Sequence, residues 1–118
     1  MSPETSEWWT VALQALEAAK ATISIDTNTA INRAYYAAFY ATTAYFTEVD
    51  KHFRKHTALR AAVHQDLVHE GHWRKDVGGA FDELMKLRIA ADYQGVVMPH
   101  EDAVRAVALA DRIVEAVR

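Results

Sequence analysis

The pair of residues best suited to chemistry is an arginine and an aspartate four positions apart, Arg88 and Asp92. In a helix this spacing brings two side chains within reach of an ion pair. Arg88 also interrupts an otherwise apolar helical stripe, formed by Val77, Phe81, Leu84, Arg88 and Ala91. Because a guanidinium keeps its charge, it is costly to bury without a partner. Arg88 is therefore either paired inside the fold or directed into a groove that binds phosphate or a carboxylate.

A second candidate group lies in a strongly aromatic segment. Tyr36 and Tyr40 follow Arg33 at i+3 and i+7, on the flank of a helix. The main stripe of that helix is Tyr35, Phe39, Thr42 and Phe46. Such an apolar arc is too wide for one ordinary core stripe, which predicts a helix at the centre of a bundle or shared with a second subunit. If the aromatic residues are all core, their hydroxyls need partners, and we expect these to be Arg33, Arg88 or Asp92.

The six histidines raise the question of a metal site. His52 and His56 are related as i and i+4, and His69 and His72 as i and i+3. Two histidines on one helix face can chelate zinc, but a third ligand must come from elsewhere. Neither pair matches a specific motif. We therefore expect no metal ion and no cofactor.

The composition limits the class of protein. With 118 residues, 51% of them hydrophobic, the chain is expected to form one domain over residues 1–118. There is no cysteine, which excludes disulfides. The net charge of −3 argues against broad nonspecific DNA binding. One local concentration of basic residues remains, either a solvated turn or a basic patch: Lys51, His52, Arg54, Lys55, His56 and Arg60.

No long uncharged apolar stretch and no basic, apolar leader are visible, so we expect a cytoplasmic protein without a membrane partner. Helical periodicity dominates instead, and it predicts an all-α antiparallel bundle of four to five helices. The expected helices run from about Pro3 to Thr22, from Asp26 or Thr27 to Glu48, from Thr57 to Glu70, from Asp76 to Asp92, and onward from Pro99. Ser2 suits an N-cap and Gly71 the position after a helix end.

Two blocks of this sequence together resemble small prokaryotic HEPN-domain proteins. Residues 32–41, Asn-Arg-Ala-Tyr-Tyr-Ala-Ala-Phe-Tyr-Ala, resemble the signature helix of that family. Residues 87–93, Leu-Arg-Ile-Ala-Ala-Asp-Tyr, resemble its second block, with an Arg-x-x-Ala-Asp-Tyr pattern. Residues 56–60, His-Thr-Ala-Leu-Arg, are similar to the segment between them. The resemblance extends from about Trp8 to Val117.

The resemblance implies a helical bundle that forms a two-fold homodimer. Family members often pair with a small nucleotidyltransferase, frequently as a toxin–antitoxin module. Many are metal-independent ribonucleases whose motif is an Arg, four to six residues, and then a His near the dimer cleft. Here the positions where that His could fall are Tyr93, Gln94 and Gly95, and the next histidine is His100. Arg88 therefore carries over as the candidate catalytic residue, whereas the histidine does not.

Tyr93 is the nearest match to a tyrosine that the partner enzyme nucleotidylates in part of the family, although its spacing from Arg88 is shorter. As a proton shuttle a tyrosine is poor at neutral pH, because its pKa is about 10.

Three hypotheses follow. The first is a module that binds RNA, nucleotide or its partner in a dimer cleft lined by Arg33, Tyr36, Tyr40, Arg88, Asp92 and Tyr93. The second is an active endoribonuclease toxin in which Arg88 stabilises phosphate charge. The third is a dimerisation module without catalysis.

Overall fold

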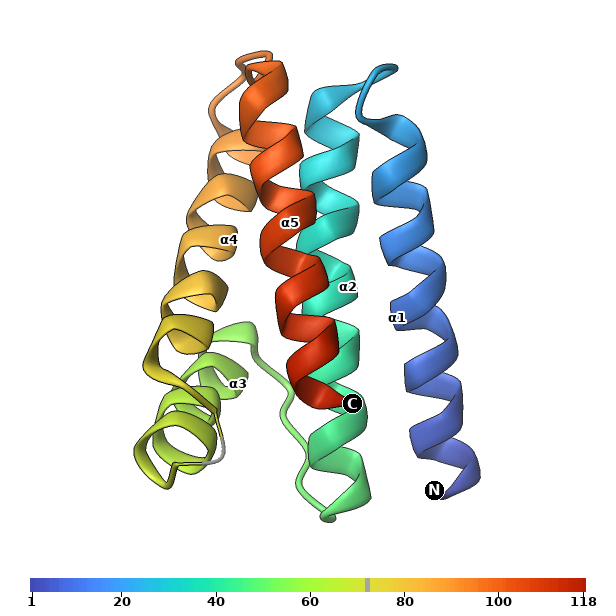
Figure 1. The fold of residues 1–118 in the computed structure, drawn as a ribbon, viewed down its shortest axis with the longest axis vertical. Helices are drawn as coiled ribbons and strands as arrows, with labels where there is room; N and C mark the ends of the chain where they lie inside the picture. The colour runs from blue at the N-terminus through green and yellow to red at the C-terminus, as the bar shows by residue number, and fades with distance from the viewer. Residues whose placement is uncertain (72) are drawn as a thin grey trace.

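The computed structural model describes residues 1–71 and 73–118, and in these residues every regular element is a helix. The elements are α1 (Pro3–Thr22), α2 (Thr27–Glu48), α3 (His56–Ala62), the π-helical segment η1 (Val63–His69), α4 (Lys75–Tyr93) and α5 (His100–Val117). The four long helices lie side by side, and α3 and η1 lie beside the beginning of α4 (Figure 1). Both termini are at the same end of the bundle. The all-α bundle predicted from the sequence is confirmed.

Local capping explains where the first two helices begin. The Ser2 side chain accepts a hydrogen bond from the backbone N–H of Thr5 at 3.1 Å, and Pro3 occupies the first turn, where a missing N–H costs nothing. Asp26 caps α2 in the same way, through a 3.1 Å bond from the N–H of Thr29. Gly71 has φ +83°, which suits glycine at the end of η1. The predicted starts of both helices, and this stop, are confirmed.

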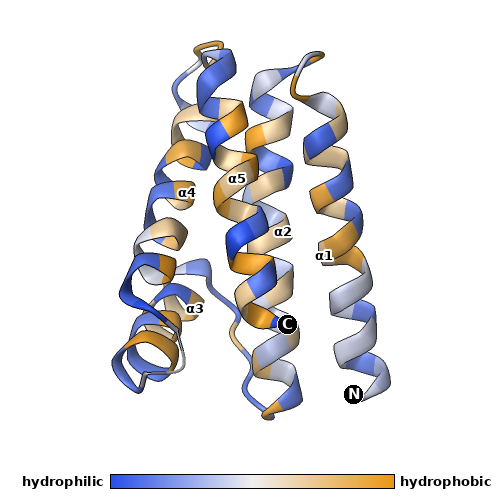
Figure 2. Ribbon diagram, viewed as in Figure 1, coloured by the Kyte–Doolittle hydropathy of each residue, from blue (hydrophilic) through white to orange (hydrophobic). Residues whose placement is uncertain are grey.

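Helix α2 is the centre of the bundle, since it packs against α1, α4 and α5. Its small residues make this possible, because alanines let neighbouring helices approach closely. They are fully buried, and they are Ala30, Ala34, Ala37, Ala38 and Ala41. The outer helices are amphipathic instead, and polar and apolar residues alternate around α5 in Figure 2. In the described residues no helix is long and apolar enough to cross a membrane.

Two sequence expectations need correction. The helix expected from Thr57 to Glu70 changes to π-helical geometry at Val63. Its wider turns pack on α4 at Gly78, where an added Cβ would lie only 2.7 Å from Cγ2 of Val68. The helix expected from Asp76 to Asp92 runs from Lys75 to Tyr93, one residue longer at each end.

Candidate functional site

Arg88 is held between α4 and α2. Its side chain is 13% exposed, and Nη1 lies 3.6 Å from Oδ2 of Asp92, one helical turn further on. The guanidinium carbon is 4.8 Å from the centre of the Tyr35 ring on α2, within cation–π range. Nε is buried and has no hydrogen-bond partner among the described residues. The expected Arg88–Asp92 pair is therefore present, but it leaves part of the guanidinium's hydrogen-bonding capacity unused.

Asn32 connects this pair to the second arginine. Its side-chain Nδ2 donates to Oδ2 of Asp92 at 3.1 Å, across the interface between α2 and α4. Its Oδ1 accepts two bonds from Arg33, from Nε at 3.0 Å and from Nη2 at 2.8 Å. The Arg33 guanidinium then lies 5.1 Å from the centre of the Tyr36 ring. One continuous chain of contacts thus fixes both guanidinium groups.

His56, the first residue of α3, completes the group. Its Nδ1 lies 2.8 Å from the Tyr35 hydroxyl, and its ring stacks on Phe39 with centroids 4.2 Å apart. It also meets the Tyr36 ring edge-on, at 5.7 Å between centroids. We call the whole group the arginine cluster, and it consists of Asn32, Arg33, Tyr35, Tyr36, His56, Arg88 and Asp92.

Burial controls the protonation of the Tyr35–His56 pair. Removal from water raises the pKa of Tyr35 to about 12, although the positive charge of Arg88 acts in the opposite direction. Burial also lowers the pKa of His56 below its ordinary value, and here Arg88 acts in the same direction. Near neutral pH the pair is therefore an uncharged phenol bonded to an uncharged imidazole.

The structure brings most of the predicted site residues together. Arg33, Tyr36, Arg88 and Asp92 belong to the arginine cluster, as shown by the contacts above. Tyr93 is at its edge, 72% exposed, with the Arg88 guanidinium 5.7 Å from the centre of its ring. Tyr40 is also peripheral. It contacts the Tyr36 ring at 5.6 Å and the Trp8 ring at 5.7 Å.

The expected partners of the tyrosine hydroxyls were wrong. Arg33 lies over the face of the Tyr36 ring, and in the described residues neither Tyr36 nor Tyr40 makes a hydroxyl hydrogen bond. The buried hydroxyl belongs to Tyr35, and its partner is His56, not an arginine or Asp92. Sequence reasoning also missed Asn32, although it directly precedes Arg33 and lies on the helix face turned toward Asp92. His56 opens the 56–60 block of the family resemblance, but its contact with Tyr35 had no sequence signal, because only the tertiary fold brings α3 to this face.

Among the described residues, the basic side chains of the 51–60 segment divide into separate contacts. Lys51 pairs with Asp66 at 2.8 Å, and Arg60 pairs with Asp82. His52 lies near Asp50, whereas His56 turns toward Tyr35, so these two do not converge. The other pair, His69 and His72, includes residue 72, which is outside the described residues. Within those residues no three histidine or carboxylate side chains are grouped to hold a metal ion.

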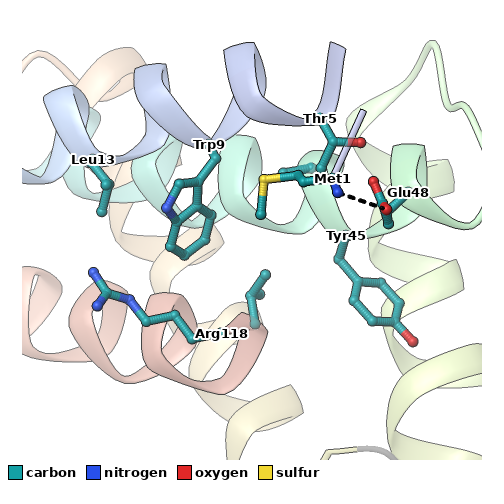
Figure 3. A pocket seen from close by; sticks show the side chains of 9 residues that line it. Met1, Thr5, Trp9, Leu13, Tyr45, Glu48 and Arg118 are labelled. Carbon is teal, nitrogen blue, oxygen red and sulfur yellow. Dashed lines mark ion pairs between the residues drawn. The ribbon is translucent and has the colours of Figure 1, made fainter. Parts of the chain in front are cut away.

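A separate cavity lies at the end of the bundle where the termini meet (Figure 3). It has a volume of about 540 Å³ and is mainly apolar. We call it the terminal pocket, and its lining is Met1, Thr5, Trp9, Leu13, Ala44, Tyr45, Glu48, Val117 and Arg118. The Arg118 guanidinium lies 5.5 Å from the Trp9 ring, and the N-terminal amine lies 3.8 Å from Glu48. It shares no residue with the arginine cluster.

The all-helical bundle agrees with the fold that the resemblance of residues 32–41 and 87–93 to HEPN-domain proteins implied. The sequence model of the HEPN domain matches residues 5–118, nearly the whole chain, and the protein belongs to this family.

Two relatives illustrate the range of similarity. A UPF0332 protein from Thermotoga maritima is 31% identical over 78 residues, which is 66% of this chain and 59% of that protein. The aligned region therefore spans less than two thirds of that relative. The crystal structure of TT1696 from Thermus thermophilus superimposes with a TM-score of 0.81, covering 98% of this chain and 97% of the other at 21% identity. At that identity the likeness supports the shared fold alone.

Proposed function

We propose that this protein is a HEPN module that binds the phosphate groups of RNA or of a nucleotide at the arginine cluster. The observation that carries the proposal is the Arg33–Asn32–Asp92–Arg88 chain of contacts, which fixes two guanidinium groups, each beside an aromatic ring. Positioned arginines suit phosphate, because the planar guanidinium offers several donors in a fixed geometry.

The charge balance favours an anionic ligand. The cluster contains two arginines and one carboxylate, Asp92, which pairs with Arg88, so the cluster carries an excess positive charge in a chain whose net charge is −3. Arg88 also keeps a buried Nε without a partner among the described residues. A scaffold ion pair alone would be expected to satisfy its donors, since unpaired buried polar groups are costly. A phosphate at this face would compensate the excess charge.

Aromatic side chains next to the arginines favour a nucleic acid or nucleotide over a simple anion. Tyr93 is exposed beside Arg88, and the Tyr36 and Tyr40 rings continue the surface from Arg33. Bases stack on such rings, with a contribution of about 1–3 kcal/mol per base. Single-stranded RNA is the ligand class that uses both types of contact.

The test compares binding of a short single-stranded RNA and of ATP by wild-type protein and by Arg33→Ala and Arg88→Lys, with folding checked by circular dichroism. Arg33→Ala should weaken binding and reduce its salt dependence, because it removes a positive charge that neutralises phosphate. Arg88→Lys keeps the charge, so it should weaken binding through loss of the planar guanidinium, with the salt dependence unchanged. Wild-type protein that binds neither ligand would overturn the proposal.

Ribonuclease activity is the second candidate, and the buried, charged Arg88 beside an exposed surface favours it, because such a group can stabilise charge that develops on a phosphate. Incubation of the pure protein with RNA in EDTA tests it. Cleavage that disappears with Arg88→Lys, while the fold is retained, would support an enzyme. Intact RNA together with tight binding would leave the binding function alone.

The proposal includes a two-fold homodimer and a small nucleotidyltransferase as partner, and both rest on family membership. A local feature that supports the dimer is the aromatic surface of Trp8, Tyr36 and Tyr40, which is only half-buried in one chain. An obligate dimer would bury about 2,000 Å² or more. Light scattering that gives only a monomer at micromolar concentration would contradict it.

A further inference from the structure

We propose that His56 is a third ligand-binding residue of the arginine cluster, and that its Nε2–H donates a hydrogen bond to a phosphate oxygen. The inference rests on the proposed phosphate-binding function and deepens it. It adds a residue from α3, an element that contributes nothing to the Arg88–Asp92 pair.

The first step is the position of His56 between the two arginines. Its ring meets Tyr36 edge-on, and the Arg33 guanidinium lies 5.1 Å from the centre of the same Tyr36 ring. It also bonds to Tyr35, and the Arg88 guanidinium lies 4.8 Å from the centre of that ring. Each arginine is thus separated from His56 by a single aromatic ring. A nucleotide or RNA segment that extends past one ring would meet both a guanidinium and the imidazole.

The second step is the accessibility of Nε2. The two nitrogens of an imidazole point away from each other, and Nδ1 is occupied by the Tyr35 hydroxyl. In the described part of the chain Nε2 makes no hydrogen bond. It is also not one of the buried polar atoms left without a partner, which there are Oγ1 of Thr47 and Nε of Arg88. His56 is half-buried, so Nε2 retains some contact with solvent, and a ligand would approach from that side.

The third step is the tautomer. A phenol with a pKa of about 12 keeps its proton at neutral pH, so Tyr35 donates and Nδ1 of His56 accepts. A neutral imidazole that accepts at Nδ1 must carry its proton on Nε2. His56 consequently presents an N–H donor to the surface. In this tautomer it is a hydrogen-bond donor for an anion and not a general base at Nε2.

Binding should then depend on pH in a defined direction. The charged and titratable groups around His56 are Tyr35, Tyr36 and Arg33 on α2 and Arg88 with its partner Asp92 on α4, and its own segment adds Lys55 and Arg60. Near His56, Arg88 disfavours the imidazolium in the free protein. A bound phosphate reverses that local field, so the complex takes up a proton and affinity rises as the pH falls below the ordinary histidine range.

The experiment titrates wild-type protein and three variants with a short single-stranded RNA and, separately, with ATP. His56→Gln keeps an N–H donor near the position of Nε2. This variant should bind within about threefold of wild type, but its affinity should no longer depend on pH. His56→Phe keeps the stacked ring without the donor. Because it also strands the Tyr35 hydroxyl, it is paired with Tyr35→Phe in a double variant, which should lose about tenfold in affinity.

The third variant, Tyr35→Phe alone, leaves the histidine but frees Nδ1, and it should lose part of the affinity because the tautomer is no longer fixed. Side-chain nitrogen NMR of the wild type should show a protonated Nε2 and an unprotonated Nδ1 at neutral pH. Tight binding of RNA but not of ATP would identify backbone phosphate as the ligand, and the opposite result a free nucleotide.

The outcomes separate the two proposals. If wild-type protein binds RNA or ATP through Arg88 but the double variant binds equally well, only the role of His56 is overturned. A protonated Nδ1 in the NMR spectrum also overturns it. If the wild-type protein binds neither ligand, the phosphate-binding function fails, and this inference fails with it.

Discussion

The arginine cluster and the terminal pocket both combine an arginine with an aromatic ring, yet they differ in what surrounds the arginine. In the cluster, Arg88 is 13% exposed and is held by residues from two helices. In the terminal pocket, the Arg118 side chain is 53% exposed, lies over the Trp9 ring and pairs with the exposed Glu115. The terminal pocket, with a cavity of about 540 Å³, therefore holds its arginine less firmly than the arginine cluster does. Fixed charge, not volume, distinguishes the candidate site.

The largest expected effect comes from reversing the charge of each arginine. Arg88→Asp places two carboxylates one turn apart on a partly buried face, and should lower the free energy of unfolding by about 3–5 kcal/mol. Arg118→Asp changes an exposed side chain and should stay within about 0.5 kcal/mol. Urea denaturation of both variants measures this. Equal losses of stability in the two variants would show that Arg88 and Arg118 contribute equally to folding.

If Arg88→Asp folds with near wild-type stability, Arg88 faces an open groove in solution, and RNA binding becomes the deciding measurement. A double-mutant cycle over Arg88 and Asp92 then gives their coupling directly. Coupling near zero, with unchanged RNA binding in both single variants, would remove the pair from the site.

The second prediction compares the stability of wild-type protein and of Tyr35→Phe at alkaline pH. Tyr35 keeps its proton in the folded state up to a pKa of about 12, whereas in the unfolded chain it ionises near 10. Since the folded pKa is raised, its contribution is fully present below about pH 10 and is lost as the pH rises toward 12, with a decrease in stability of about 2–3 kcal/mol. Tyr35→Phe should flatten this part of the pH profile.

The sequence predicted the fold well because the fold depends on local signals. Ser2, Asp26 and Gly71 act within one helical turn, and the alanines of α2 act through their size alone. The Arg88–Asp92 pair is local in the same sense. His56 and Tyr35 are not, since their contact depends on how the chain returns from the end of α2 to α3. The helical periodicity of the sequence does not predict such a contact.

The third prediction concerns the packing of η1 against the beginning of α4, the helix that carries Arg88 and Asp92. Gly78→Ala would place a Cβ 2.7 Å from Cγ2 of Val68, a stiff β-branched side chain, so η1 or α4 must shift. We expect a loss of about 1–3 kcal/mol despite alanine's better helix propensity. Gly79→Ala is the matched control, because nothing lies within 4 Å of its added Cβ, and it should stabilise by about 0.5–1 kcal/mol. Thermal unfolding of the pair isolates the packing effect. A stabilised Gly78→Ala would show that η1 is not packed against α4 as described.

The smallest expected change in stability is also the most specific for function, and it compares two asparagines on α2. Asn28 donates to the backbone carbonyls of Ala91 and Val96 and accepts from the N–H of Met98, so it holds the connection between α4 and α5. Asn32 instead bridges Asp92 to Arg33. Loss of a hydrogen bond costs about 0.5–1.5 kcal/mol, so Asn28→Ala should destabilise more than Asn32→Ala, which should cost about 1 kcal/mol.

RNA affinity should follow the opposite order, because Asn32→Ala releases Arg33 from its fixed position while Asn28→Ala leaves both arginines in place. Parallel unfolding and RNA-binding titrations would show the two orders. If RNA affinity follows stability in both variants, the affinity depends only on how stably the bundle is folded. If the orders are opposed, the Asn32 bridge is itself part of the binding site, because its main effect is on the ligand and not on the fold.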